Sequence, residues 1–194
     1  MSRSAELVRG TTETRVTVSL ELDGIGDADV GSGLGFLDHM LTTLARHSGF
    51  DLTMRAEGDV VVDDHHTVED CAIVVGRALD EALGDRSGIT RFGYAYAPLD
   101  ESLARAVVDL SGRAWPEVSI PFARATIGQV ATENVVHFLR TLAIEGRMAL
   151  HVDLIRGDND HHKAEAAFKA LALALHSAVA IRGEGVPSTK GSLQ

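Results

Sequence analysis

The chain has 194 residues, 45% of them hydrophobic, which suits one compact domain or two small ones packed as a unit. The formal net charge of -10 argues against a surface for non-specific nucleic-acid binding. No segment approaches the ~20 apolar residues of a membrane span. Residues 1–15 lack the apolar region of a signal peptide, and the single cysteine agrees with a reducing compartment, so a cytoplasmic location is expected.

In the first half, alternating apolar and polar residues predict strands over 14–22 and 50–56. Helical spacing predicts a helix over 35–49 that is ended by Gly49, and a longer apolar helix over 65–84. The order in this half is therefore strand, helix, strand, turn and long helix.

The second half repeats this order. Alternation predicts strands over 103–110, 116–122 and 148–154, and helical spacing predicts helices over 132–146 and 161–183. The two copies indicate a duplicated module.

Each copy of the module is expected to be a small sheet backed by two helices, which gives an α+β fold of two half-modules packed as one unit. The expected boundaries are residues 1–92 for the first half-module, 93–186 for the second and 187–194 for a C-terminal tail.

A pair of adjacent histidines begins each long helix. Residues three or four apart on a helix share a face, so Glu69 stands beside His65 or His66, whereas the two adjacent rings point about 100° apart. One metal ion would have difficulty taking both rings, but two ions could each take one. The second half repeats the set as His161, His162 and Glu165, and the shorter helices add His39 and His137.

Together these residues offer six imidazoles and two carboxylates, enough for two sites with three nitrogens and one oxygen each. This donor set suits Mn, Fe, Co, Ni or Zn better than Mg or Ca. It would close a tetrahedral zinc site but leave an octahedral ion with free positions for substrate, and the sequence leaves both open. His47 lies two turns after His39, where it either supports a ligand or faces substrate. Cys71 is expected to be a small buried residue.

Five motifs in order, "GFLDHML", "DDHHTVEDCAI", "DLSGR", "DNDHHKAEAAFKALA" and "PSTKG", resemble the imidazoleglycerol-phosphate dehydratase family of histidine biosynthesis. The resemblance runs from about Arg9 to the C-terminus and is that of the single-activity form, since no second domain is left over. It implies a hydro-lyase with the duplicated two-layer fold known as ribosomal S5 domain 2-like.

The resemblance also implies two Mn²⁺ ions per active site and a cage of 24 subunits with active sites between subunits. One ion would take His39, His66, His161 and Glu165. The other ion would take His65, Glu69, His137 and His162. This division gives the two histidines of each doublet to different ions.

The family's reaction converts D-erythro-1-(imidazol-4-yl)glycerol 3-phosphate to 3-(imidazol-4-yl)-2-oxopropyl phosphate and water. The departing proton is on a carbon that is not next to a carbonyl, so the imidazole ring must act as electron sink. Ions on the ring nitrogens would favour an imidazolate that expels the hydroxyl group. Glu13 matches the family's acid–base residue, and a metal-bound Glu69 or Glu165 could share that role.

Cations for the substrate phosphate are implied at positions that would each be read as solvated surface residues without the resemblance. These positions are Arg91, Arg113, Lys169 and Lys190, with the Ser188 hydroxyl beside them. The fork of Arg113 suits bidentate phosphate contact. The complete expected substrate-binding set is Glu13, His39, His47, His65, His66, Glu69, Arg91, Arg113, His161, Lys169, Ser188 and Lys190.

Two other functions fit the histidine clusters. A metal-dependent phosphate-ester hydrolase would use similar donors and release inorganic phosphate. A non-enzymatic metal-binding cage would take up many ions per chain and be indifferent to Arg91, Arg113 and Lys190.

Overall fold

The computed structural model describes residues 3–189 and 193, which form two halves with the same order of main elements. The first half contains β1 (Ser4–Gly10), β2 (Thr14–Glu21), β3 (Ala28–Gly31), α1 (Gly35–Ser48), β4 (Asp51–Gly58) and α2 (His65–Leu83). The second half contains β5 (Phe92–Leu99), β6 (Ser102–Asp109), β7 (Trp115–Ser119), β8 (Thr126–Ile127), β9 (Val130–Ala131), α3 (Thr132–Glu145), β10 (Ala149–Arg156) and α4 (Asp160–Val179).

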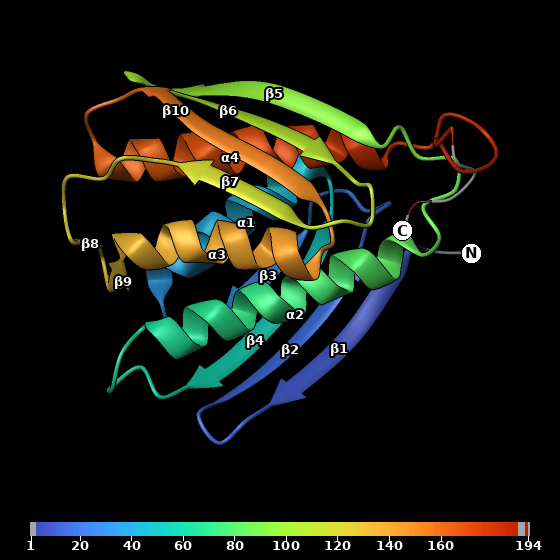
Figure 1. The fold of residues 1–194 in the computed structure, drawn as a ribbon. Helices are drawn as coiled ribbons and strands as arrows, with labels where there is room; N and C mark the ends of the chain where they lie inside the picture. The colour runs from blue at the N-terminus through green and yellow to red at the C-terminus, as the bar shows by residue number, and fades with distance from the viewer. Residues whose placement is uncertain (1–2, 190–192, 194) are drawn as a thin grey trace.

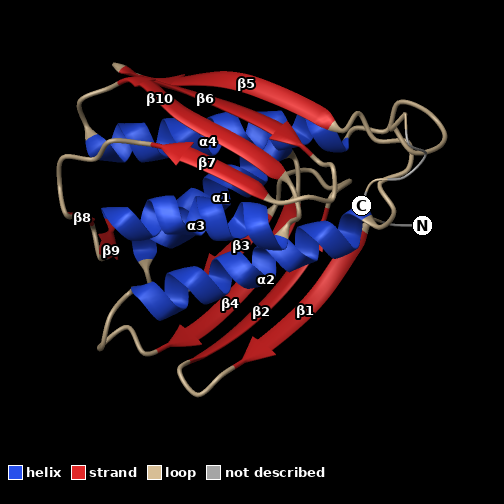
Figure 2. Ribbon diagram, viewed as in Figure 1, coloured by secondary structure: helices blue, strands red, loops and turns tan. Residues whose placement is uncertain are grey.

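Each half builds one four-stranded sheet with the same topology. The strand orders are β1-β2-β4-β3 and β5-β6-β10-β7. In both sheets the first three strands are antiparallel and the last is parallel to its neighbour. Helices α1 and α2 cover the first sheet, α3 and α4 cover the second, and the two helix layers face each other between the sheets (Figures 1 and 2). The predicted duplicated α+β fold is confirmed.

The predicted elements form for the reasons that their patterns indicate. In β2, Val16, Val18 and Leu20 are buried while the residues between them face outward, because successive side chains of a strand point to opposite faces. Gly49 ends α1 with φ of 78°, and its N–H donates to the carbonyl of Ala45. A left-handed residue is needed there, and glycine adopts that conformation without a steric cost.

Two predicted elements are shorter than expected. The strand predicted over 116–122 ends at Ser119, where pairing with β10 stops, and Pro121 has no N–H to extend the ladder. The helix predicted over 161–183 ends at Val179. The carbonyl of Ala180 instead accepts hydrogen bonds from Thr90, so the chain turns to run beside the start of the second half.

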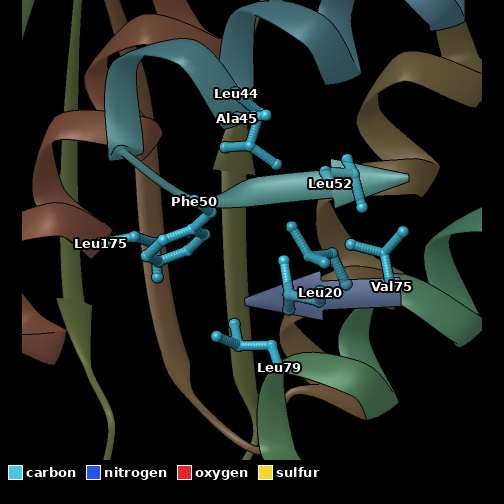
Figure 3. Close-up of a pocket in the computed structure, with 9 residues that line it drawn as sticks. Leu20, Leu44, Ala45, Phe50, Leu52, Val75, Leu79 and Leu175 are labelled. Atoms are coloured by element: carbon cyan, nitrogen blue, oxygen red, sulfur yellow. The ribbon is translucent and has the colours of Figure 1, made fainter. Parts of the chain in front are cut away.

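One continuous apolar core fills the space between the sheets. It contains a cavity of about 20 Å³ whose walls include Leu20 and Leu52 of the first sheet, Leu44 of α1 and Leu175 of α4 (Figure 3). The cavity has room for about one water molecule, but its apolar lining offers no hydrogen-bonding partner, so it is expected to be dry. Among the described residues, every helix is too short or too polar to cross a bilayer.

Strand β5 approaches α4 so closely that Gly93 has no room for a side chain. A Cβ at this position would lie 1.9 Å from the carbonyl oxygen of Ala174. We expect Gly93→Ala to lower the free energy of unfolding by about 3 kcal/mol, measured by urea unfolding, because the backbone itself must move. Gly10→Ala is the matched control, since no atom of the other described residues, its two chain neighbours aside, lies within 4 Å of the new Cβ. Equal stability of the two variants would contradict this packing.

Candidate metal centre

The first cluster of metal-ligand side chains joins α1 of the first half to α4 of the second. Nε2 of His39 lies 3.1 Å from Oε2 of Glu165, and Nε2 of His161 lies 3.3 Å from the same oxygen. His161 and Glu165 are one helical turn apart and therefore share a face. The edge of Phe36 packs against His161 with ring centroids 5.3 Å apart, which limits how that imidazole can turn.

The second cluster joins α2 of the first half to α3 of the second. Nε2 of His137 lies 3.0 Å from Oε1 of Glu69, and the rings of His65 and His137 stack with centroids 5.0 Å apart. Nδ1–H of His65 donates to Oδ1 of Asn134 at 3.0 Å, so its Nε2 is the nitrogen left for an ion. Each cluster thus combines one helix from each half.

The dimensions of both clusters fit a divalent transition ion. Among the described residues, the only two groups of this kind are His39, His161, Glu165 and His65, Glu69, His137, with donor atoms within 4.8 Å of one another. Two ligands on opposite sides of an ion at about 2.1 Å would be about 4.2 Å apart, so little movement is needed. Two imidazoles and one carboxylate leave at least one coordination position open.

The second histidine of each doublet points away from these clusters. Nδ1–H of His66 donates to Asp59 at 3.1 Å, and Nδ1–H of His162 donates to Glu101 at 2.7 Å. The rings of His161 and His162 are almost perpendicular, and those of His65 and His66 meet at 75°. Within one chain each cluster therefore has three of its four expected ligands.

The acidic partners change the proton affinity of these histidines. A hydrogen bond to Asp59 raises the pKa of His66, and a hydrogen bond to Glu101 raises the pKa of His162. The pKa of Glu101 is lowered by its hydrogen bond to His162 and by backbone N–H groups. Both pairs are therefore held by charge-assisted hydrogen bonds when the rings are protonated.

Glu165 sits beside a lysine as well as beside histidines. Burial favours its neutral form, but hydrogen bonds from Lys169 and His39 outweigh burial and lower its pKa to about 2. Nζ of Lys169 lies 2.7 Å from Oε1 of Glu165. The pKa of His47 is lowered, first by burial of the ring and then by the positive charge of the nearby Lys169. The Lys169 and His47 side chains thus border the first cluster.

Other residues expected to bind phosphate lie near the C-terminal end of α4, whereas Glu165 lies near its N-terminal end. Arg91 donates to Asp109 through Nε at 2.6 Å and to the carbonyl of Pro187 at 2.9 Å, so it holds the segment that contains Ser188. The N–H of Arg91 donates to the carbonyl of Ala178, which is about 20 Å along α4 from Glu165. Figure 1 shows this separation between the start and end of α4.

The Arg113 side chain is exposed and directly follows Gly112. Gly112 itself lies against Leu193 and against Arg86, a residue just beyond the end of α2. Arg113 therefore also lies away from the clusters. The expected Lys190 falls outside the described residues.

Glu13 lies in the turn between β1 and β2, close to the first doublet. Its carboxylate is half exposed, with Oε2 3.8 Å from Nδ1 of His66. The hydroxyl of Thr11 accepts the N–H groups of Glu13 and Thr14, which closes the turn. Thr14 in turn donates its hydroxyl to Asp70 of α2, so the turn is fixed to the helix that bears the doublet.

Sequence reasoning did not identify Asn134, Asp59 and Glu101 as partners of the histidines. Polar residues in turns and first helical turns are usually solvated, so their type alone gives no signal. The duplication gives a usable signal for Glu101 alone, because it places this residue at the turn position equivalent to that of Glu13.

Comparison with known proteins gives one consistent family. The profile of the imidazoleglycerol-phosphate dehydratase family matches residues 32–175. Imidazoleglycerol-phosphate dehydratase of Chlorobium phaeovibrioides is 50% identical over 190 residues, covering 98% of this chain and 95% of the relative. The protein of that name from Phytophthora nicotianae is 54% identical over 192 residues, 98% of this chain, but the chain spans only 42% of that relative's length.

Solved structures agree with these sequence matches. The crystal structure of imidazoleglycerol-phosphate dehydratase from Staphylococcus aureus has a TM-score of 0.84 and 38% identity, covering 92% of this chain and 99% of that one. The Pyrococcus furiosus structure, solved in complex with (S)-C348, has a TM-score of 0.82 and 34% identity, covering 96% of this chain and all of that one.

The lowered pKa of Glu165 predicts a pH dependence of stability in chelator-stripped protein. Its contribution is fully present above pH 4.5, the ordinary pKa, and is lost as the pH falls toward 2. Glu165→Gln should therefore lose less unfolding free energy across this window than the parent chain, measured by urea unfolding. Glu117→Gln, at an exposed position of β7, should follow the parent. Parallel curves for Glu165→Gln and the parent would show that Lys169 and His39 do not stabilise this carboxylate.

Proposed function

The chain belongs to the imidazoleglycerol-phosphate dehydratase family of hydro-lyases, and we propose that it dehydrates D-erythro-1-(imidazol-4-yl)glycerol 3-phosphate to 3-(imidazol-4-yl)-2-oxopropyl phosphate in histidine biosynthesis. The observation that carries this proposal is the pair of clusters, each with two imidazoles and one carboxylate. Similar donors alone would also suit a hydrolase, and the membership of the chain in a hydro-lyase family supports dehydration over hydrolysis.

The proposed cofactor is Mn²⁺, two ions per active site. His39, His161 and Glu165 would hold one ion and His65, Glu69 and His137 the other, with His66 and His162 as the fourth ligands. Bound ions would supply Lewis acidity to the imidazole ring of the substrate, so that the ring can take up the electrons left by the departing proton. Ligand type supports manganese, iron, cobalt, nickel or zinc over magnesium and calcium.

The protein's own groups would bind the substrate and move its protons. We propose Glu13 as the acid–base residue at the side chain of the substrate, because its carboxylate is half exposed beside the first doublet. The turn that carries Glu13 is tied to α2 through Thr14 and Asp70, which limits its movement. Lys169 and His47 would contribute the part of the phosphate site next to the first cluster.

Completion of this site requires more than one copy of the chain. Arg91 and the segment with Ser188 lie about 20 Å along α4 from Glu165, too far for one small substrate to reach both. His66 and His162 also turn away from the clusters of their own chain. Active sites between subunits, in a proposed assembly of 24, would bring these groups together.

The experiment that tests the function is a dehydratase assay on chelator-stripped protein with the imidazole substrate and Mn²⁺ added back. We expect no product without the metal and metal-restored formation of the oxopropyl phosphate. Glu69→Gln and Glu165→Gln should weaken Mn²⁺ binding by about 100-fold or more, since loss of supporting groups alone costs about 10–100-fold. Release of inorganic phosphate in place of the dehydration product would contradict the proposal and favour the hydrolase.

Intersubunit sites predict complementation between two inactive variants. Glu165→Gln should disable the first cluster, and Arg113→Ala should disable the phosphate side of the site. Oligomers assembled from equal amounts of the two variants should regain about one quarter of the parent activity. Each site takes Glu165 from one chain and Arg113 from another, and with random mixing both groups are intact in about one quarter of the sites. Activity no higher than that of either variant alone would place both groups in the same chain's site. The control is the two separately assembled variants, mixed without exchange of subunits.

A further inference from the structure

The two halves contain equivalent hairpins that carry a glutamate at the same position. In the β1–β2 hairpin Gly10 pairs with Arg15, and in the β5–β6 hairpin Pro98 pairs with Leu103. The same register places Glu13 and Glu101 at equivalent positions of the two turns. Both lie near the second histidine of a doublet: Glu13 is 3.8 Å from His66, and Glu101 is 2.7 Å from His162.

The surroundings of the two glutamates are nevertheless different. Glu101 accepts hydrogen bonds from His162 Nδ1 at 2.7 Å, from the backbone N–H groups of Asp158 and Asn159, and from the hydroxyl of Ser102 at 3.1 Å. Its two oxygens are therefore fixed against the start of α4. Four donors hold this carboxylate, whereas the carboxylate of Glu13 stays beyond hydrogen-bonding distance of His66.

A single difference between the long helices accounts for part of this divergence. Thr14 and Ser102 occupy equivalent hairpin positions. In the first half, Thr14 donates its hydroxyl to the buried Asp70 of α2. The equivalent residue of α4 is Ala166, which offers no side-chain acceptor, and the hydroxyl of Ser102 is directed to Glu101 instead.

We infer that Glu101 is a positioning residue that fixes His162 with its proton on Nδ1 and its Nε2 available to a metal ion. A carboxylate that accepts one ring N–H of a histidine fixes the tautomer and the ring orientation and makes the other nitrogen a better ligand. Asp59 does the same for His66. Since Asp59 holds His66, Glu13 is left free for proton transfer, so the two equivalent glutamates have different roles.

This inference rests on the proposed function, because it assigns His162 to a metal ion. Nε2 of His162 lies 3.9 Å from Oδ2 of the exposed Asp100, beyond hydrogen-bonding distance. The nitrogen opposite Glu101 is therefore not engaged by that neighbour, and the imidazole presents it at the surface of the chain with 27% of the side chain exposed.

The experiment measures Mn²⁺ affinity of the chelator-stripped full chain, without substrate, from the electron paramagnetic resonance signal of free Mn²⁺. Glu101→Ala should weaken binding of one class of ions by about 10–100-fold. Glu101→Gln retains an acceptor oxygen and should restore most of the affinity. The control is Glu117→Ala, at an exposed position of β7, which should bind Mn²⁺ as the parent does.

A double-mutant cycle separates this role from simple support of the loop at the start of α4. In a His162→Ala background, Glu101→Ala should cause no further loss of affinity, because its effect passes through the imidazole. An equal loss in both backgrounds would show that Glu101 acts through the backbone of Asp158 and Asn159 and would overturn the inference.

The remaining outcomes are also decisive. Unchanged affinity in Glu101→Ala, with an unfolding midpoint equal to that of Glu117→Ala, would overturn the positioning role but leave the metal sites intact. A parent chain that binds no Mn²⁺ would overturn the proposed metal sites and this inference with them. If Glu101→Ala does not fold, Glu101→Gln is compared with His162→Ala instead. An Mn²⁺ affinity of Glu101→Gln as low as that of His162→Ala would contradict the positioning role of Glu101.

Discussion

The packing of each short helix against the long helix of the other half is the contact on which the candidate site depends. α1 packs on α4 and α2 packs on α3, and each contact brings one histidine to an i, i+4 histidine–glutamate pair. Within the described part of the chain, neither half alone contains a complete group. The site therefore depends on both copies of the module, since the two sheets with their helices must face each other before three donor atoms can meet.

Helix geometry then explains why the histidines come in doublets. Neighbouring residues point about 100° apart, so the first histidine of each pair joins its own cluster and the second faces outward. The outward rings of His66 and His162 are fixed by Asp59 and Glu101. A doublet can in this way serve two ions in two places, which suits an assembly in which neighbouring chains share sites.

Much of the fold could be predicted from local patterns, and the misses have physical causes. The strong alternation of β2 and the long apolar face of α4 are local signals, and both elements were predicted. Strand β5 was not, because its inner positions are glycine and alanine, small enough for α4 to pack directly on the backbone. Strands β1 and β3 were also not predicted, since β3 has only four residues and β1 is an edge strand.

The candidate site was predictable to the extent that its residues lie on the same helical face. Spacing could indicate that His161 and Glu165 meet, but the approach of His39 depends on tertiary packing. The roles of Asp59 and Glu101 depend on turns that fold back onto the doublets, and the hydropathy pattern of the sequence does not predict those contacts. The distance between Arg91 and Glu165 is likewise a property of the folded chain.

We infer that both clusters bind divalent ions where the helices of the two halves pack on each other. The most direct measurement is anomalous diffraction, at the manganese absorption edge, from crystals of the Mn²⁺-loaded protein. We expect one anomalous peak among His39, His161 and Glu165 and a second among His65, Glu69 and His137. Fully loaded crystals with peaks elsewhere, or with only one of the two clusters occupied, would contradict it.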